Sequence, residues 1–300
     1  MRYTKIAIFG AGSVGSTIAY ALMLENIAAE INLIDTNEIR CRGEILDLSD
    51  ALSFCYPSKI KNGTPLDAKN ADIIIIAAGK KQEPGQDRRI LLEANKKVVS
   101  SIMNSINPVN ENSLIIMVTN PVDAMTYYAQ QLSNLPKSHI FGSGTFLDTQ
   151  RLREQIAHRL HIAEQSIHAY ILGEHGDSQF PAWSLARIAG ISLNHFGLTE
   201  SNLNTIAKNT KDKAYEIIAC KGATFYGIAS CVTALCRTII FNQKRITPLS
   251  CYIEKYGICL SLPVILGAQG IEKILDLPLN EHEQKKLDAS ATILAKLINS

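Results

Sequence analysis

The stretch KIAIFGAGSVGSTIAYALMLEN (residues 5–26) contains a strand, a glycine-rich turn and a helix, and it decides the fold. KIAIFG (5–10) is a short β-rich run, and STIAYALMLEN (16–26) has helical periodicity. Between them, GAGSVG (10–15) follows a G-x-G-x-x-G pattern. Glycine at the first position allows a tight turn, and glycine at the last position allows the helix to pack closely on the strand. The stretch therefore predicts the start of a βαβ unit.

The rest of the first half repeats this alternation. Helix-like stretches such as RRILLEANKKVVSSIMNSI (88–106) separate three further β-rich runs, which are INLID (31–35), DIIIIAA (72–78) and LIIMVTN (114–120). Such alternation predicts the α/β class, with a doubly wound parallel sheet (Rossmann) covered by helices on both faces. We place this nucleotide-binding domain at residues 1–142.

The pattern changes from about residue 145. A helix-like segment, TFLDTQRLREQIAHRL (145–160), leads into IHAYIL (167–172) and then into a polar, glycine-rich loop. Long helices follow, and a short-strand region lies around CLSLPVIL (259–266). We expect a second, α+β substrate domain over residues 143–300, packed tightly on the first because no low-complexity linker separates them.

Composition excludes several classes of protein. Of the 300 residues, 46% are hydrophobic and 19% charged, which is ordinary for a globular protein, and a net charge of +2 gives no general attraction for nucleic acid or anionic membranes. Seven cysteines, an odd number without a C-x-x-C pair, fit reduced thiols better than disulfides or a zinc site. We therefore expect a soluble, cytoplasmic protein with no metal site, no nucleic-acid partner and no membrane partner.

One stretch, ATFYGIASCVTALC (223–236), is uncharged and invites comparison with a membrane span. Its fourteen residues end at Arg237, short of the roughly 20 that a span needs. Its serine and threonine content favours a buried core helix. The chain also begins with a strand-like segment, and no signal or transit peptide is visible.

The glycine pattern gains specificity from its context. It follows a strand, opens a helix, and is followed 20 residues after Gly15 by Asp35, at the end of the second strand. The N-terminus of such a helix faces the phosphates of a dinucleotide, and Gly12 leaves room for the pyrophosphate. A carboxylate at position 35 accepts hydrogen bonds from the adenosine ribose and repels a 2′-phosphate. These residues predict NAD as the cofactor, in preference to NADP.

A histidine, an aspartate and an arginine form a candidate catalytic set. His175 lies in the loop ILGEHGDS (171–178), between two glycines and two acids. Asp148 and Arg151 lie three residues apart, on one face of the expected helix. A carboxylate beside an imidazole fixes its tautomer and stabilises its protonated form, and a guanidinium can bind a carboxylate in a bidentate manner. These residues fit a proton-transfer site and a plain ion-pair network equally well.

Seven motifs occur in the order found in one family. They are GAGSVG, the Asp35 position, the loop GKKQEPGQDRR (79–89), VTNPVD (118–123), GSGTFLDTQRLR (142–153), GEHGDS (173–178) and KGATFYG (221–227). On these motifs the chain resembles the lactate/malate dehydrogenase family, and within it the bacterial L-lactate enzymes. The resemblance covers nearly the whole chain. It implies reversible hydride transfer between NADH and pyruvate, as in glycolysis with pyruvate fermentation.

The resemblance also implies roles for individual residues. His175 would be the proton donor and acceptor, with Asp148 as its orienting partner, and Arg151 would bind the substrate carboxylate. Arg88, on a lid formed by residues 79–89, would polarise the ketone. The substrate pocket of a 2-keto or 2-hydroxy acid would comprise Gln82, Arg88, Asn120, Arg151 and Thr224. The cofactor would contact Gly10, Gly12, Val14, Gly15, Asp35, Arg40, Ala78, Gly79 and Asn120.

Gln82 is the residue expected to set the substrate. Malate dehydrogenases carry arginine at the corresponding position, so a neutral glutamine favours pyruvate over oxaloacetate. Dehydrogenases for bulkier 2-hydroxy acids remain an alternative, because GEHGDSQFPAWS (173–184) also resembles the hydroxyisocaproate enzymes. NAD-dependent glycosidases would need a metal site, and an NAD-sensing protein would not need the catalytic residues. Two lysines before Gln82 depart from the smaller residues usual in the family.

A regulatory site is a separate hypothesis. Arg153 and His168 match positions that bind fructose 1,6-bisphosphate at a subunit interface in allosteric bacterial relatives. In a homotetramer or homodimer, two-fold symmetry would bring two such pairs together as a four-cation cluster. The alternative is that both residues are ordinary polar groups at a surface or an interface.

Overall fold

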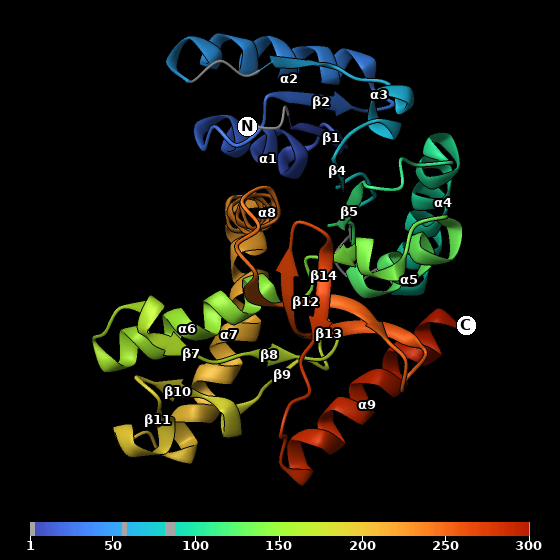
Figure 1. Ribbon diagram of the computed structural model, residues 1–300. Helices are drawn as coiled ribbons and strands as arrows, with labels where there is room; N and C mark the ends of the chain where they lie inside the picture. The colour runs from blue at the N-terminus through green and yellow to red at the C-terminus, as the bar shows by residue number, and fades with distance from the viewer. Residues whose placement is uncertain (1–3, 56–58, 82–87, 300) are drawn as a thin grey trace.

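The computed structural model describes residues 4–55, 59–81 and 88–299 and shows one long twisted sheet with helices on both faces (Figure 1). Six strands run parallel in the order β3-β2-β1-β4-β5-β6. This order is the doubly wound arrangement that the sequence predicts. Their bounds are β1 (Lys5–Phe9), β2 (Glu30–Ile34), β3 (Lys59–Asn62), β4 (Ile73–Ile76), β5 (Leu114–Met117) and β6 (Ile140–Gly142).

Apart from the edge strand β3, the parallel strands are largely buried on both faces, as a sheet covered by helices requires. In β4, Ile73 and Ile75 pack into a core that includes α1 and α8 (Tyr226–Ile240). Ile74 and Ile76 pack into a core that includes α4, α5 and α9 (Glu281–Ile298). Alternate side chains of a strand point to opposite faces, so one run of four isoleucines serves both cores. The helices of this half are α1 (Ser13–Leu24), α2 (Glu38–Ala51), α3 (Pro65–Lys69), α4 (Arg88–Ile106) and α5 (Val122–Leu132).

The sheet continues beyond β6 into the second half of the chain. β12 (Arg245–Ile253), β13 (Ile258–Gly267) and β14 (Gly270–Ile274) are antiparallel, and β12 joins β6 where Ser250 lies opposite Gly142. The predicted division into residues 1–142 and 143–300 is therefore not a break in the sheet, and it stays a prediction. β12 was not expected, since the strands predicted for this region lie only around CLSLPVIL (259–266). Pro248 pairs with Pro263 of β13.

Four long helices belong to the second half, and two of them, α8 and α9, pack against the first. α8 lies against α1 and contributes Val232, Leu235 and Cys236 to the same core (Figure 1). The prediction of a buried core helix around residues 223–236 is thus confirmed. Among the described residues, no helix combines the length and the apolar character that crossing a bilayer requires. These helices are α6 (Phe146–Leu160), α7 (Glu200–Lys221), α8 (Tyr226–Ile240) and α9 (Glu281–Ile298).

The remaining strands are short and form two small sheets beside α6 and α7. A third core holds them there, with Leu152 and Ile156 of α6, Ile171 of β8 and Ile206 of α7 at its centre. The strands are β7 (Ile167–His168), β8 (Ile171–Leu172), β9 (Phe180–Pro181), β10 (Arg187–Ile188) and β11 (Ile191–Ser192). Single turns of 3-10 helix span Leu52–Phe54, Lys137–His139, Glu164–Ser166, Trp183–Leu185 and Leu193–Phe196. Directly after β8, Gly173 pairs with Ser261 of β13, which holds the start of the GEHGDS loop against the large sheet.

Candidate active site

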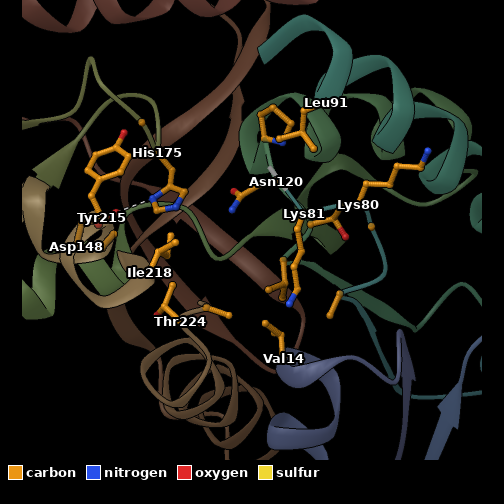
Figure 2. A pocket seen from close by; sticks show the side chains of 18 of the residues that line it. Val14, Lys80, Lys81, Leu91, Asn120, Asp148, His175, Tyr215, Ile218 and Thr224 are labelled. Atoms are coloured by element: carbon orange, nitrogen blue, oxygen red, sulfur yellow. Dashed lines mark hydrogen bonds and ion pairs between the residues drawn. The ribbon is translucent and has the colours of Figure 1, made fainter. Parts of the chain in front are cut away.

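A cavity of about 390 Å³ extends from the glycine-rich turn to the loop after β8. Its walls also include the segments that follow β4 and β5 and the C-terminal part of α7. In doubly wound sheets, ligands bind outside the carboxyl ends of the strands, where the strand order reverses. β1 lies at that reversal, between β2 and β4, and the turn after β1 supplies Gly12 and Val14 to the cavity. Figure 2 shows the side chains that converge on it.

The glycine-rich turn depends on three glycines for three different reasons. Gly10 has φ +103°, and a Cβ there would lie 2.8 Å from the backbone nitrogen of Ala78. A Cβ at Gly15 would lie 1.8 Å from the carbonyl oxygen of Gly10. At Gly12 a Cβ would meet no described atom within 4 Å, so this position faces open space. α1 begins directly after Gly12 without a side-chain cap, and its first backbone N–H groups are available to an anion.

Asp35 follows β2 and holds the glycine-rich turn, and it does not line the cavity. Its Oδ2 accepts a hydrogen bond from the Ala11 N–H at 2.6 Å, and its Oδ1 accepts one from the Asn37 N–H at 2.8 Å. Arg40, one turn into α2, is exposed and pairs with Glu44 at 3.8 Å from its Nε. Each Asp35 oxygen keeps one lone pair for a further donor.

The segments after β4 and β5 are tied together by Asn95, a fully buried residue of α4. Its Oδ1 accepts the Lys80 N–H at 2.7 Å, and its Nδ2 donates to the Asn120 carbonyl oxygen at 2.7 Å. Gly79 lines the cavity, and a Cβ there would lie 2.6 Å from the Thr119 methyl carbon. Asn120 lines the cavity too, opposite His175 in Figure 2. Sequence reasoning missed Asn95, although a polar residue on the buried face of α4 is a signal for such a role.

His175, Asp148 and Arg151 form one buried chain of polar contacts. Asp148 Oδ2 lies 2.6 Å from His175 Nδ1, and Asp148 Oδ1 accepts a hydrogen bond from Arg151 Nη1 at 3.0 Å. The side chains of Asp148 and Arg151 are only 2% and 7% exposed, whereas His175 is 28% exposed on the cavity side. Arg151 does not line the cavity as it stands. The structure brings the three predicted side chains together, and their roles stay predictions.

Within the His175–Asp148–Arg151 set, Asp148 and His175 each stabilise the ionised form of the other. Burial raises the pKa of Asp148, but His175 and Arg151 outweigh it and bring that pKa below its ordinary value. Burial lowers the pKa of His175, but Asp148 outweighs it, with a smaller contribution from Asp123, and the pKa ends above its ordinary value. The imidazole is therefore easier to protonate than a histidine in water. That property suits a proton donor.

Asp123 is a second carboxylate behind His175, and sequence reasoning quoted it in VTNPVD without giving it a role. It lies in the first turn of α5 and is 1% exposed. Its Oδ2 accepts a hydrogen bond from the backbone N–H of His175 at 2.7 Å. Burial raises the pKa of Asp123 to about 6, against the lowering effects of Ser250 and His175.

The wall beside His175 is formed by α7 and the residues after it. Thr224 lines the cavity, and Figure 2 shows it below Ile218 and Tyr215, which sequence reasoning did not single out. Lys80 and Lys81 also line the cavity. In Figure 2 the Lys81 side chain extends toward Val14, while the Lys80 side chain points away from His175.

The side chains of two expected lid residues cannot be placed, and the expected regulatory pair lies away from the cavity. Gln82 lies outside the described residues, and Arg88 is the first residue of α4, with a side chain that is also outside them. Arg153 donates from Nε to the Ala169 carbonyl oxygen at 3.2 Å and stacks over Tyr170. His168, the neighbour of Ala169 in β7, is exposed. Neither Arg153 nor His168 lines the cavity.

Comparison with known proteins gives a consistent result over both halves of the chain. Residues 4–142 match the model of the lactate/malate dehydrogenase NAD binding domain, and residues 145–300 match that of the lactate/malate dehydrogenase alpha/beta C-terminal domain. L-lactate dehydrogenase A of Rhizopus oryzae is 44% identical over 97% of this chain and 91% of its own. L-lactate dehydrogenase of Lacticaseibacillus casei is 40% identical over 99% of this chain and 94% of its own length. The crystal structure of a lactate dehydrogenase from a Medee basin deep-sea metagenome library superimposes with a TM-score of 0.95 and is 35% identical in sequence. The match covers 100% of this chain and 99% of that one.

Proposed function

We propose that this chain, which belongs to the lactate/malate dehydrogenase family, catalyses reversible hydride transfer between NADH and pyruvate, giving L-lactate. The observation that carries the proposal is the Asp148–His175 pair, 2.6 Å apart, on the wall of a cavity that begins at the glycine-rich turn. Reduction of a ketone by a nicotinamide cofactor needs a dinucleotide site and a proton donor in one pocket. Both features border this cavity.

The residues around the turn fit NAD. The uncapped N-terminus of α1 and the open space at Gly12 suit a pyrophosphate, and Asp35 suits the hydroxyl groups of an adenosine ribose. Bound NADH would supply the hydride for the keto carbon of the substrate. We propose that Gly10, Gly15 and Ala78 shape the turn and that Val14, Gly79 and Asn120 border the cofactor. Arg40 would reach the adenosine end.

His175 would move the proton. Its Nδ1 is engaged by Asp148, which leaves Nε2 as the nitrogen that can donate to the ketone oxygen. In the direction of pyruvate reduction the imidazolium gives up this proton, and in the direction of lactate oxidation the neutral imidazole accepts one. Asp148 keeps the ring in one orientation in both directions.

Binding of the substrate would rest on two arginines and a lid. Arg151 uses one nitrogen on Asp148, and its other donors would grip the substrate carboxylate in a bidentate manner. Arg88 would stabilise the negative charge that develops on the ketone oxygen when residues 79–89 close over the site and exclude water. Thr224 would face the methyl group of pyruvate from one side, and Gln82 from the lid.

We also propose a regulatory site and an assembly of two or four copies. Arg153 and His168 would bind fructose 1,6-bisphosphate across a two-fold interface. The contact of Arg153 with Ala169, the residue next to His168, supports this idea, because it anchors the arginine beside the segment that carries the histidine. All seven cysteines are free and five are buried, and such thiols suit the reducing conditions of the cytoplasm.

A panel of 2-keto acids tests the proposed function. Initial rates with NADH would be measured for pyruvate, oxaloacetate and 2-ketoisocaproate at one pH. We expect the highest kcat/KM for pyruvate. A preference for 2-ketoisocaproate would identify a dehydrogenase for bulkier acids, and a preference for oxaloacetate would identify a malate enzyme.

Gln82→Arg sharpens the same test. A second carboxylate, as in oxaloacetate, would be desolvated under the closed lid without a partner, at a cost of several kcal/mol. Arginine at this position would supply the partner and shift preference toward oxaloacetate by several orders of magnitude, since about 1.4 kcal/mol is worth tenfold. Gln86→Arg adds the same charge elsewhere in the loop and serves as the control. A mutant at position 82 that keeps its preference for pyruvate would show that Gln82 does not face the substrate.

A further inference from the structure

The hydrogen-bond ladder between β4 and β5 ends where the cavity begins. Within the described residues, the last main-chain hydrogen bond between these two segments runs from the Thr119 N–H to the Ile76 carbonyl oxygen at 3.1 Å. Beyond this bond, residues 79–81 and Asn120 line the cavity. Main-chain pairing therefore does not fix the distance between the two cavity-lining segments.

Two side chains link the segments where the main-chain ladder stops. The Thr119 hydroxyl donates a hydrogen bond to the Ala78 carbonyl oxygen at 2.7 Å. Farther along, Asn95 Oδ1 accepts the Lys80 N–H at 2.7 Å, and Asn95 Nδ2 donates to the carbonyl oxygens of Lys80 at 3.2 Å and Asn120 at 2.7 Å. An asparagine amide has two donor hydrogens. Asn95 uses one of them on each segment.

The amide of Asn95 lies behind the cavity wall. Asn95 is fully buried and does not line the cavity, whereas Lys80 and Asn120, which it bonds, both line it. Gly79 lies close to the same amide, because a Cβ at Gly79 would lie 3.1 Å from Asn95 Oδ1. Breaking one of these bonds would leave a polar group buried without a partner. The bonds therefore resist separation of the two segments.

Asn95 also joins both segments to α4. This helix begins at Arg88, the residue proposed above to stabilise charge on the ketone oxygen, and Asn95 lies about two turns later. α4 packs on α5, which begins just after Asn120. One amide thus connects the helix that presents Arg88, the segment 79–81 and the segment that carries Asn120. The proposed reaction needs these groups at fixed distances from one nicotinamide and one ketone.

We propose that Asn95 is a positioning residue of the active site, which sets the separation between residues 79–81 and Asn120 and so directs Asn120 toward the nicotinamide and the substrate. The inference rests on the proposed function, because it concerns the geometry of the same site. Asn95 acts only through the residues that it bonds. Misplacement of reacting groups by about 1 Å can cost about 10²-fold in rate, so such a link affects turnover without touching the substrate.

Gln130 offers a matched control, because it makes a similar set of bonds away from the cavity. This residue of α5 is 6% exposed, and its Nε2 donates to the carbonyl oxygens of Lys137 at 3.3 Å and Ile140 at 2.8 Å. Its Oε1 accepts a hydrogen bond from the Cys259 thiol at 3.3 Å. None of these four residues lines the cavity. Loss of either amide should lower stability, whereas only the loss of the Asn95 amide should disturb the site.

The test compares alanine variants of these two residues. Asn95→Ala should lower kcat for pyruvate by about 10²-fold, and Gln130→Ala should keep kcat near the wild-type value. The dissociation constant of NADH should change much less than kcat in both variants, because the glycine-rich turn is untouched. Urea unfolding measures the stability of each variant, and the rates are taken at a temperature where both are folded.

Asn95→Asp separates hydrogen bonding from volume. The variant keeps the size of the side chain and the acceptor for the Lys80 N–H, but it loses both donors. We expect the same loss of kcat as in Asn95→Ala, and this variant decides the matter if Asn95→Ala does not fold. Crystal structures of the wild-type protein and of the folded Asn95 variant would give the distance between the Cα atoms of Lys80 and Asn120, which should increase in the variant.

The outcomes distinguish the inference from the proposed function. An unchanged kcat in the Asn95 variants, or a loss in Gln130→Ala as large as that in Asn95→Ala, overturns the role of Asn95. An unchanged distance between Lys80 and Asn120 overturns it as well. A wild-type protein that does not reduce pyruvate overturns the proposed function instead, and the crystallographic comparison remains readable without turnover.

Discussion

The two ends of the cavity are built in different ways. At the nucleotide end, the turn of residues 10–15 offers backbone N–H groups and three glycines, and one contiguous motif supplies most of it, with Asp35 holding the Ala11 N–H. At the catalytic end, His175 is held by side chains 27 and 52 residues away in the sequence, from two different helices. The first end depends on the shape of the main chain and the second on buried charge. Substitutions should therefore affect them by different mechanisms.

His175→Ala should produce the largest effect and confine it to one end. Removal of the general acid is expected to lower kcat for pyruvate by about 10²–10⁴. The dissociation constant for NADH, measured by fluorescence titration, should change little, because the glycine-rich turn is untouched. His282→Ala, at an exposed position of α9, is the control. A smaller loss of kcat than this, with no increase when external imidazole is added, would point to another proton donor.

Asp123→Asn should remove a loss of stability that the wild-type protein undergoes as pH rises to neutral. The ordinary pKa of the carboxyl group is 3.8 and its pKa in the folded protein is about 6, so ionisation disfavours folding. The wild-type protein begins to lose stability as pH rises past the ordinary pKa. The loss is complete above the folded-state pKa, where it amounts to about 3 kcal/mol. Urea unfolding of both proteins between pH 4 and pH 8 measures it. The difference between them should grow across this range, and a constant difference would contradict the assignment.

Gly15→Ala and Gly12→Ala should separate the two uses of glycine at the nucleotide end. A methyl group at Gly15 would collide with the Gly10 carbonyl, so we expect a loss of about 1–3 kcal/mol of stability. At Gly12 it would enter open space, leaving stability nearly unchanged but weakening NADH binding. Gly43→Ala, within α2 and free of contacts, should stabilise the protein slightly. Thermal unfolding and NADH titration of the three variants give the comparison. Equal stability of the Gly12 and Gly15 variants would contradict the distinction between a crowded and an open glycine position.

The double variant Asp35→Ser with Thr36→Arg should have the smallest effect, a change of about tenfold in the preference between NADH and NADPH. It removes the repulsion of the 2′-phosphate and adds a cation that can bind it. Affinity for NADH should also fall, because Asp35 holds the Ala11 and Asn37 N–H groups. Asp47→Ser, exposed in α2, controls for the loss of an acid. If the wild-type enzyme already used NADPH as well as NADH, Asp35 would not be the selector.

The nucleotide half was predictable because its signals are local. The G-x-G-x-x-G turn and the alternation of apolar runs with helical periodicity were enough to predict the doubly wound sheet. Of the β12–β13 hairpin, the sequence predicted the strand region around residues 259–266 and missed β12, which pairs with it along its whole length. β3 was missed since KIKN carries no apolar run.

In the catalytic half, too, contacts within one helix were predictable and contacts between distant segments were not. Asp148 and Arg151 share a helix face, so their spacing already predicted that they could meet. Nothing in the sequence says that Asp123 would lie under the backbone of His175, or that Asn95 would join Lys80 to Asn120. Those contacts arise only when the strands pair and the helices pack.

The continuity of the sheet has a consequence for protein engineering. β6 is joined to β12 from the other half of the chain, and α8 from that half covers α1. Exchanging the nucleotide half between relatives by a cut at residue 143 would move β6 and α1 without β12 and α8. Such a chimaera would expose an unpaired strand edge and an apolar helix face unless the new partner matched both, and these two features promote aggregation. A workable swap must carry α8 and the β12 edge along with the segment that they cover.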